Sequence, residues 1–123
     1  MTQTIEMTRT TEEVFISHRE AIETVNIEQL MADYAEDCLF VTPDDSFVGR
    51  EAILSGFFQA FMAQFPDAKI NFDRVTIEGD ICLIEWTSEA SAMTIPVGLG
   101  VLFIQDGFIQ RQVEWFQMEL KEG

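Results

Sequence analysis

Residues 106–117 read Asp106-Gly107-Phe108-Ile109-Gln110-Arg111-Gln112-Val113-Glu114-Trp115-Phe116-Gln117, and this stretch decides the fold. An Asp-Gly pair is typical of a tight hairpin, because both residues tolerate the positive φ angles that a two-residue turn requires. The residues after the pair are rich in β-branched and aromatic side chains, which favours a strand. The sequence therefore predicts a hairpin turn that leads into a long final strand, 108–118.

Turn residues divide the rest of the second half into further strands. Glu78-Gly79-Asp80 separates two runs, 68–77 and 80–91, that are rich in β-branched and aromatic residues. A third run, 97–104, precedes the Asp106-Gly107 turn. Because tight turns join antiparallel neighbours, we expect an antiparallel sheet.

The first half of the chain carries helix signals. Thr10 and Glu13 have the spacing of a capping box, so a helix is expected to begin there. Within this helix, His18 lies on or beside the inward apolar stripe. Asn26 begins a second helix, whose apolar positions recur at spacings of three and four as far as Tyr34.

A short strand over 39–42 precedes an acidic turn and a third helix. The third helix is expected to begin after Gly49, which can take a positive φ at a sharp turn, and to end at Pro66. Apolar side chains cover more than one stripe of this helix, which indicates packing on several sides. They are Ile53, Leu54, Phe57, Phe58, Phe61, Met62 and Phe65.

Helices first and hairpin-joined strands afterwards indicate an α+β fold, with helices packed over one face of a curved antiparallel sheet. A sheet of this kind can enclose a cavity. We expect one domain over residues 1–123, since the chain is too short for a second core, with residues 1–9 as a flexible N-terminus.

The charge of the chain excludes several classes of partner. Seven Lys and Arg against 22 Asp and Glu give a net charge of −15, which repels phosphate backbones and anionic lipid headgroups. We therefore expect no nucleic-acid partner and no membrane partner. The first residues lack a basic start and an apolar run, so a cytoplasmic protein is expected.

Cys38 and Cys82 are the two cysteines, and each lies within a strand-like apolar run. Neither belongs to a CxxC pair or stands near a His and Cys cluster, so we expect buried free thiols. With a single histidine and no ligand spacing, the sequence predicts no metal and no cofactor.

Four segments occur in an order found in one superfamily of folds: Asn26 to Asp37, Val48-Gly49-Arg50-Glu51-Ala52-Ile53, Ile84-Glu85-Trp86-Thr87 and Asp106-Gly107-Phe108-Ile109. In this order the chain resembles the superfamily of nuclear transport factor two, ketosteroid isomerase, scytalone dehydratase and the SnoaL-like polyketide cyclases. The resemblance spans most of the chain. It implies a cone-shaped, cystatin-like roll with a pocket under the helices.

The resemblance also allows a test for catalytic residues. Ketosteroid isomerase pairs an aspartate base with an oxyanion hole made of a tyrosine and a protonated aspartic acid. The resemblance places His18, Thr42 and about Gly100 at those positions, so the isomerase triad is absent. SnoaL-like cyclases use a carboxylate near the end of the last strand, where this chain has Gln117, and an amide takes no proton at neutral pH.

His18 is therefore the expected catalytic residue, because an imidazole titrates near neutrality and can donate or accept a proton. The alternative is a hydrogen-bonded histidine at a contact between helix and sheet.

The ligand pocket follows from the same placement. If Gln117 faces the cavity, then Trp115 and Arg111 share its face, because side chains alternate along a strand. Arg111 is then either the cation of the cavity or the partner of Glu85 or Asp73 in a salt bridge. The expected pocket consists of Tyr34, Thr42, Phe57, Phe61, Trp86, Arg111, Trp115 and Gln117.

The opposite face of the last strand carries Gln112, Glu114, Phe116 and Met118, a mixture that suits a recognition surface. Homodimers through the sheet are common in the resembling families, so we expect these four residues to form a dimer face.

Two hypotheses remain open. In the first, the protein binds a small apolar molecule and uses His18 for a metal-free isomerisation, cyclisation or dehydration by proton transfer. In the second, it is a noncatalytic homodimerisation or docking module with a vestigial pocket.

Overall fold

The structure is a computed structural model that describes residues 8–122. It begins with two helices, α1 (Thr11–Thr24) and α2 (Ile27–Ala32). The capping box is confirmed, since Thr10 accepts a hydrogen bond from the amide of Glu13 and donates its own N–H to the Glu13 carboxylate. Asn26 caps α2 with its side chain, as an N-cap asparagine does.

Six strands form one sheet in the order β2-β1-β6-β5-β4-β3. Their bounds are β1 (Tyr34–Val41), β2 (Ser46–Val48), β3 (Lys69–Glu78), β4 (Ile81–Glu89), β5 (Met93–Gln105) and β6 (Phe108–Leu120). The purely antiparallel sheet expected from the hairpins is wrong in one place, because β1 and β6 run parallel. The segment between these two strands includes the third helix and two hairpins, which is long enough to bring β6 back alongside β1 in the same direction.

Several boundaries differ from the prediction, most of all at the start of β1, predicted at residue 39, and at the start of β5. The second helix ends at Ala32, and Tyr34 already belongs to β1. β5 begins at Met93, four residues before the predicted start, although it contains Pro96. The pairing of β5 with β6 is irregular between Thr94 and Val97, and proline is tolerated at such an irregularity because no ladder hydrogen bond needs its missing N–H.

The third helix is present, but it is not a regular α-helix. It consists of α3 (Arg50–Ile53), a π-helical segment η1 (Leu54–Gln59) and α4 (Ala60–Gln64). Gly49 precedes it with a φ of 92°, which confirms the predicted need for a glycine at that turn.

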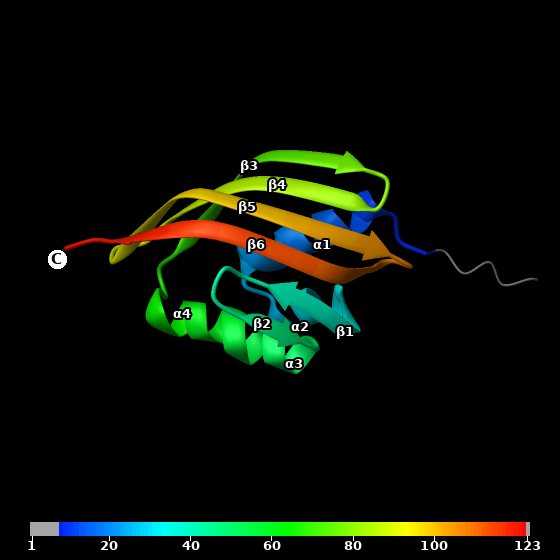
Figure 1. The fold of residues 1–123 in the computed structure, drawn as a ribbon, viewed down its shortest axis with the longest axis horizontal. Helices are drawn as coiled ribbons and strands as arrows, with labels where there is room; N and C mark the ends of the chain where they lie inside the picture. The colour runs from blue at the N-terminus through cyan, green and yellow to red at the C-terminus, as the bar shows by residue number, and fades with distance from the viewer. Residues whose placement is uncertain (1–7, 123) are drawn as a thin grey trace, which may run out of the picture.

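The helices cover one face of the sheet, as an α+β fold requires (Figure 1). In this view α1 lies behind the sheet, and the segment α3-η1-α4 runs along the side of β1 and β2. Irregular pairing in β3, β4, β5 and β6 bends the sheet around the helices. The main core lies between α1 and the inner face of the sheet, and it includes Val14, Phe40, Leu102, Ile104 and Ile109.

The N-terminal end of the described chain is held in place. Arg9 donates to Asp33 Oδ1 at 2.8 Å and to the carbonyl of Gly107 at 2.7 Å, which ties it to the turn between β5 and β6. Residues 1–7 of the segment predicted to be flexible lie outside the described residues, whereas Arg9 is ordered by these contacts.

Cys38 and Cys82 are free and buried, as predicted. Burial raises the pKa of Cys38 to about 12 and that of Cys82 to about 11, so both remain thiols at neutral pH. Within residues 8–122, no helix has the length and apolar character needed to cross a membrane. Over the same residues, no three His, Cys, Asp or Glu side chains gather closely enough to hold a metal ion.

Candidate functional site

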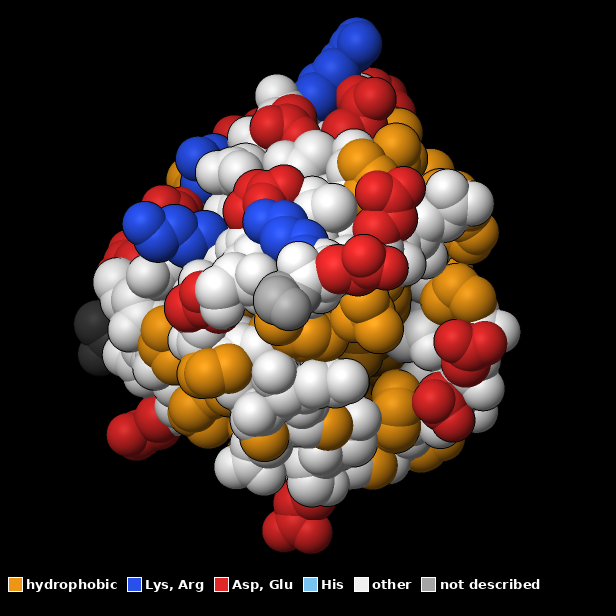
Figure 2. All heavy atoms as spheres, turned by 90° about the vertical axis from the view of Figure 1, so that its left-hand side faces the viewer, with side chains coloured by type: hydrophobic (Ala, Val, Ile, Leu, Met, Phe, Trp, Pro, Cys, Tyr) orange, Lys and Arg blue, Asp and Glu red, His pale blue; other side chains and the backbone are white. Residues whose placement is uncertain are grey.

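A cavity opens between α1, the π-helical segment and the inner face of the sheet. The end of the molecule that faces the viewer in Figure 2 is hollowed, with hydrophobic side chains in the hollow and acidic side chains around it. The cavity has a volume of about 70 Å³. Its walls are largely aromatic and aliphatic, and the lining residues are His18, Ile22, Phe57, Phe58, Phe61, Ile70, Phe72, Ile84, Trp86, Ile95, Gln112, Glu114 and Phe116.

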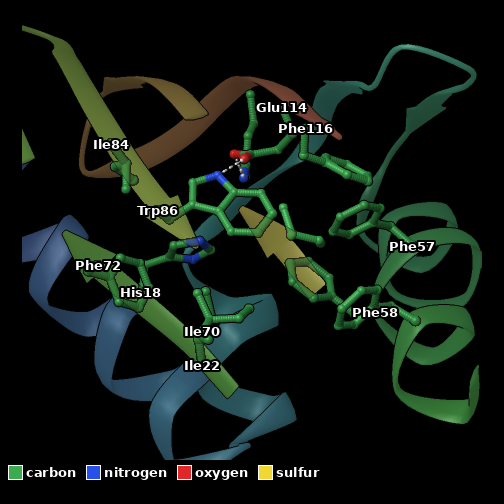
Figure 3. A pocket seen from close by; sticks show the side chains of 13 residues that line it. His18, Ile22, Phe57, Phe58, Ile70, Phe72, Ile84, Trp86, Glu114 and Phe116 are labelled. Carbon is green, nitrogen blue, oxygen red and sulfur yellow. Dashed lines mark hydrogen bonds between the residues drawn. The ribbon is translucent and has the colours of Figure 1, made fainter. Parts of the chain in front are cut away.

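Glu114 is the one carboxylic acid among these lining residues of the described chain. Its side chain is 7% exposed. The Trp86 indole donates to Glu114 Oε1 at 3.0 Å, and the Gln112 amide donates to Oε2 at 2.7 Å (Figure 3). Both donors are neutral, so this buried acid has no cationic partner among the hydrogen bonds of the described residues.

Burial raises the pKa of Glu114 to about 7, and the hydrogen bonds from Gln112 and Trp86 oppose this rise only in part. An acid with this pKa is present in both its protonated and its ionised form at neutral pH. It can therefore take a proton from a bound molecule or give one to it, which is the requirement for a general acid or base.

Tyr34 sets the orientation of the Gln112 amide. The Tyr34 hydroxyl donates to Gln112 Oε1 at 2.6 Å, so the amide directs its NH₂ group toward Glu114. Tyr34 is fully buried, and burial raises its pKa well above the ordinary value, which keeps the hydroxyl protonated as a donor. The chain Tyr34, Gln112, Glu114 fixes the carboxyl group from one side, and Trp86 fixes it from the other.

His18 lines the cavity from α1 and is 2% exposed. Its ring meets the Tyr34 ring edge to face, with the centroids 5.6 Å apart. Burial lowers the pKa of His18 to about 4, so the imidazole is neutral at pH 7. The buried Nδ1 atom has no hydrogen-bond partner among the described residues, so the predicted alternative of a hydrogen-bonded histidine at a helix–sheet contact does not describe this atom.

The predicted orientation of β6 is the reverse of the one observed. Gln112, Glu114 and Phe116, expected on the dimer face, point into the cavity, whereas Trp115 and Gln117 are exposed on the outer face. The fourth residue of the expected dimer face, Met118, is half-buried and packs on the small cluster that includes Met93 and Ile95.

The prediction was wrong at its starting point, since the resemblance placed Gln117 in the cavity and the structure places it on the outer face. A β-bulge explains how Glu114 comes to face inward. Phe103 pairs with Arg111, and the next residue, Ile104, pairs with Ile109, so Gln110 is an extra residue on β6. Ile109 points inward, and uninterrupted alternation from it would also turn Arg111 and Trp115 inward. The extra residue shifts the alternation by one, which moves every later side chain to the other face.

The remaining predicted pocket residues divide into two groups. Phe57, Phe61 and Trp86 line the cavity, and Tyr34 lies behind it. Thr42 lies elsewhere, in the turn before β2, where its hydroxyl accepts from the amide of Asp45. Arg111 is exposed on the outer face, and neither proposed salt bridge forms between described residues; Glu85 instead lies 3.7 Å from Arg74.

Glu114 was missed as a pocket residue, because alternation was counted from Gln117, which the resemblance placed in the cavity and which lies on the outer face. The sequence does carry one signal for a polar group inside the cavity, since Gln112 and Glu114 alternate with hydrophobic Val113 and Trp115 in a strand with apolar residues on both faces. That pattern does not indicate which face is inward.

Comparisons with known proteins agree with the fold. A family model described as the SnoaL-like domain matches residues 16–116. No curated protein matches the chain.

Several solved structures share the fold. A protein from Kribbella flavida, provisionally named a ketosteroid isomerase, aligns with a TM-score of 0.73 and 20% identity over 96% of this chain and 86% of its own. A protein from Sinorhizobium meliloti, provisionally named a polyketide cyclase, aligns with a TM-score of 0.72 and 18% identity over 82% of this chain and 92% of its own. TerC, co-crystallised with polyporic acid, aligns with a TM-score of 0.76 and 15% identity over 87% of this chain and 91% of its own. At these identities the likeness concerns the fold alone.

Proposed function

Because the chain belongs to the SnoaL-like domain family, we propose that it binds a small, largely apolar molecule in the cavity and that Glu114 transfers a proton to or from that molecule. The observation that carries this proposal is a buried carboxyl group, with a pKa of about 7, in a cavity lined mainly by aromatic and aliphatic side chains. The reaction class is an isomerisation, cyclisation or dehydration.

Glu114 suits the proton-transfer role better than His18. With a pKa of about 4, His18 remains neutral at pH 7 and is a weak base. A neutral imidazole can still form a hydrogen bond with a polar group of the bound molecule, and its unpartnered Nδ1 is available for one. We therefore assign proton transfer to Glu114 and orientation of the ligand to His18.

The names of similar structures support the class of ligand. TerC was crystallised with polyporic acid, and two other structures carry isomerase and cyclase names. Ligand pockets typically measure about 300–1,000 Å³. The cavity of about 70 Å³ is smaller, and Phe57 and Phe58 form part of its wall. We propose that these side chains move apart when a ligand binds.

Proton abstraction can be tested without the natural substrate. We would incubate the protein in D₂O with 2-tetralone, an apolar bicyclic ketone, and follow exchange of its α-hydrogens by NMR. The wild-type protein is expected to accelerate exchange, and Glu114→Gln to lower the rate about 10²–10⁴-fold, the usual contribution of a general base. His18→Ala should weaken binding of the ketone more than it slows exchange in the bound state.

Asp67→Asn is the matched control, because Asp67 is an exposed carboxylate that accepts a hydrogen bond from the Ser91 amide, away from the cavity. It should leave exchange unchanged. Exchange that survives Glu114→Gln at the wild-type rate would rule out Glu114 as the base.

The second candidate is the noncatalytic homodimerisation module, and one observation favours it. The outer face of the sheet exposes large apolar side chains on neighbouring strands, with Leu99 39%, Val113 42% and Trp115 45% exposed. Leu99 pairs with Trp115 across β5 and β6, so these side chains are contiguous. In this candidate a second copy of the chain covers the outer face, which includes Trp115 and excludes Glu114.

A further inference from the structure

The hydrogen bond between Trp86 and Glu114 spans an entire strand. Trp86 lies on β4 and Glu114 on β6, and β5 runs between them. Neighbouring strands lie about 4.8 Å apart, so the backbones of β4 and β6 are separated by roughly 10 Å. The indole and the carboxyl group nevertheless approach to 3.0 Å, which requires both side chains to lie flat across the inner face of β5.

Two glycines of β5 lie beneath this contact. Gly98 pairs with Trp86 on one side and with Phe116 on the other, and Gly100 pairs with Ile84 and Glu114. A Cβ atom at Gly98 would lie 2.3 Å from Cε2 of the Trp86 ring. A Cβ atom at Gly100 would lie 2.5 Å from Oε2 and 2.8 Å from Oε1 of Glu114. The indole and the carboxyl group therefore occupy the space that two side chains would fill.

Backbone conformation does not explain these glycines. The described glycines with positive φ are Gly49, Gly79 and Gly107, so Gly98 and Gly100 have backbone angles that other residues also adopt. Glycine within a strand is destabilising, because it orders a flexible backbone and packs no side chain. Space above the strand is the remaining physical reason for glycine at both positions.

We propose that Gly98 and Gly100 are positioning residues that create a trough across β5, and that this trough holds Glu114 buried against Trp86. Burial in the trough removes the carboxyl group from water, and the two donors fix its plane. The role of Gly100 in catalysis rests on the proposed function, but its role in holding Glu114 can be measured without a substrate.

Gly100→Ala tests the proposal through titration. The carboxyl group of Glu114 lies at the end of a flexible side chain, so it can rotate away from the new methyl group into the open part of the cavity. In the wild-type protein, the NMR signals of the Glu114 carboxyl carbon and the Trp86 indole N–H should titrate together with a midpoint of about 7. In Gly100→Ala, the Glu114 midpoint should fall by more than about one pH unit toward 4.5, and the indole signal should no longer follow it.

The chain provides two controls. Trp115 is the other tryptophan and is exposed, so its indole signal is an internal reference that should not follow Glu114 in either protein. Val101→Ala changes the same strand on its outer side and should keep the wild-type midpoint. Gly98→Ala should break the same hydrogen bond from the indole side.

Wild-type titration in both Gly100→Ala and Gly98→Ala would overturn the proposal. If Gly100→Ala fails to fold, the double variant Gly100→Ala/Glu114→Ala tests whether the clash with Glu114 is the cause. Removal of the Glu114 side chain removes the clash and should restore folding, whereas a double variant that stays unfolded contradicts the proposal. Failure of 2-tetralone exchange leaves these titrations unaffected, so the two proposals fail separately.

Discussion

At the scale of single residues, burial shifts the pKa values of Glu114 and His18 in opposite directions. Both line one cavity, and burial disfavours the charged form of each. The pKa of Glu114 therefore rises to about 7, and that of His18 falls to about 4. At neutral pH the cavity contains a partly protonated acid and an uncharged imidazole, which suits an uncharged ligand.

These pKa shifts predict opposite effects of pH on stability. Between pH 4.5 and about 7 the folded protein keeps a proton on Glu114 that the unfolded chain releases, so the free energy of unfolding falls by about 3 kcal/mol as pH rises through this range. Between about pH 4 and 6.5 His18 is protonated in the unfolded chain but not in the folded protein. The contribution of His18 to the free energy of unfolding therefore rises by about 3 kcal/mol as pH rises through this range. The two slopes oppose each other in the wild-type protein.

Urea unfolding between pH 4.5 and 8 separates the two groups. Relative to wild type, Glu114→Gln should gain stability as pH rises to about 7, because the variant lacks the carboxyl group whose contribution to the free energy of unfolding falls over this range. His18→Asn should lose stability, relative to wild type, as pH rises to 6.5. Differences from wild type cancel the contributions of surface acids such as Glu13 and Asp67. Parallel pH profiles for all three proteins would contradict both assignments.

At the scale of elements, the π-helical segment η1 forms one wall of the cavity. Phe57 and Phe58 are adjacent in this segment, and their rings meet edge to face with the centroids 5.1 Å apart. Both line the cavity, and neither is fully buried. A π turn is wider than an α turn, and π-bulges are frequent at functional sites. In this protein, η1 points two adjacent aromatic side chains toward one cavity.

Phe58→Ala should enlarge the cavity and admit larger ligands. Because Phe58 is half-buried, we expect a loss of about 2 kcal/mol in the free energy of unfolding, less than for a fully buried phenylalanine. Binding of 2-naphthol, measured by quenching of tryptophan fluorescence, should become faster. Gln59→Ala, an exposed position of the same segment, should change neither quantity. Slower or unchanged binding in Phe58→Ala would show that this wall does not limit entry.

At the scale of the whole molecule, net charge and the outer face would act in opposite directions on the homodimer of the second candidate. The net charge of −15 makes two copies repel each other, whereas the apolar outer face favours their contact. Salt screens the repulsion and leaves the apolar contact intact. A homodimer through this face should therefore become stronger as ionic strength rises.

Trp115→Glu should prevent this association. Sedimentation velocity is expected to show a dimer for the wild-type protein and a monomer for the variant, because the substitution places a charge in the centre of the apolar face. Ile16→Glu is the matched control, since Ile16 is 60% exposed on α1, on the other side of the sheet. If Trp115→Glu remains as dimeric as Ile16→Glu, the contact lies elsewhere.

Local signals in the sequence determined the elements of this fold. The capping box of Thr10 and Glu13, the cap at Asn26, and the turns at Gly79 and Gly107 act through neighbouring residues, so they could be identified from the chain alone. The order of these elements was enough to indicate the family, which the family model confirms.

The tertiary structure alone decided which residues form the site. One extra residue in β6, Gln110, determines that Glu114 faces the cavity, and a bulge is defined by pairing with a distant strand. The trough over Gly98 and Gly100 likewise requires β4, β5 and β6 in register. Such contacts join residues far apart in the chain, and alternation along one strand contains no information about its partners.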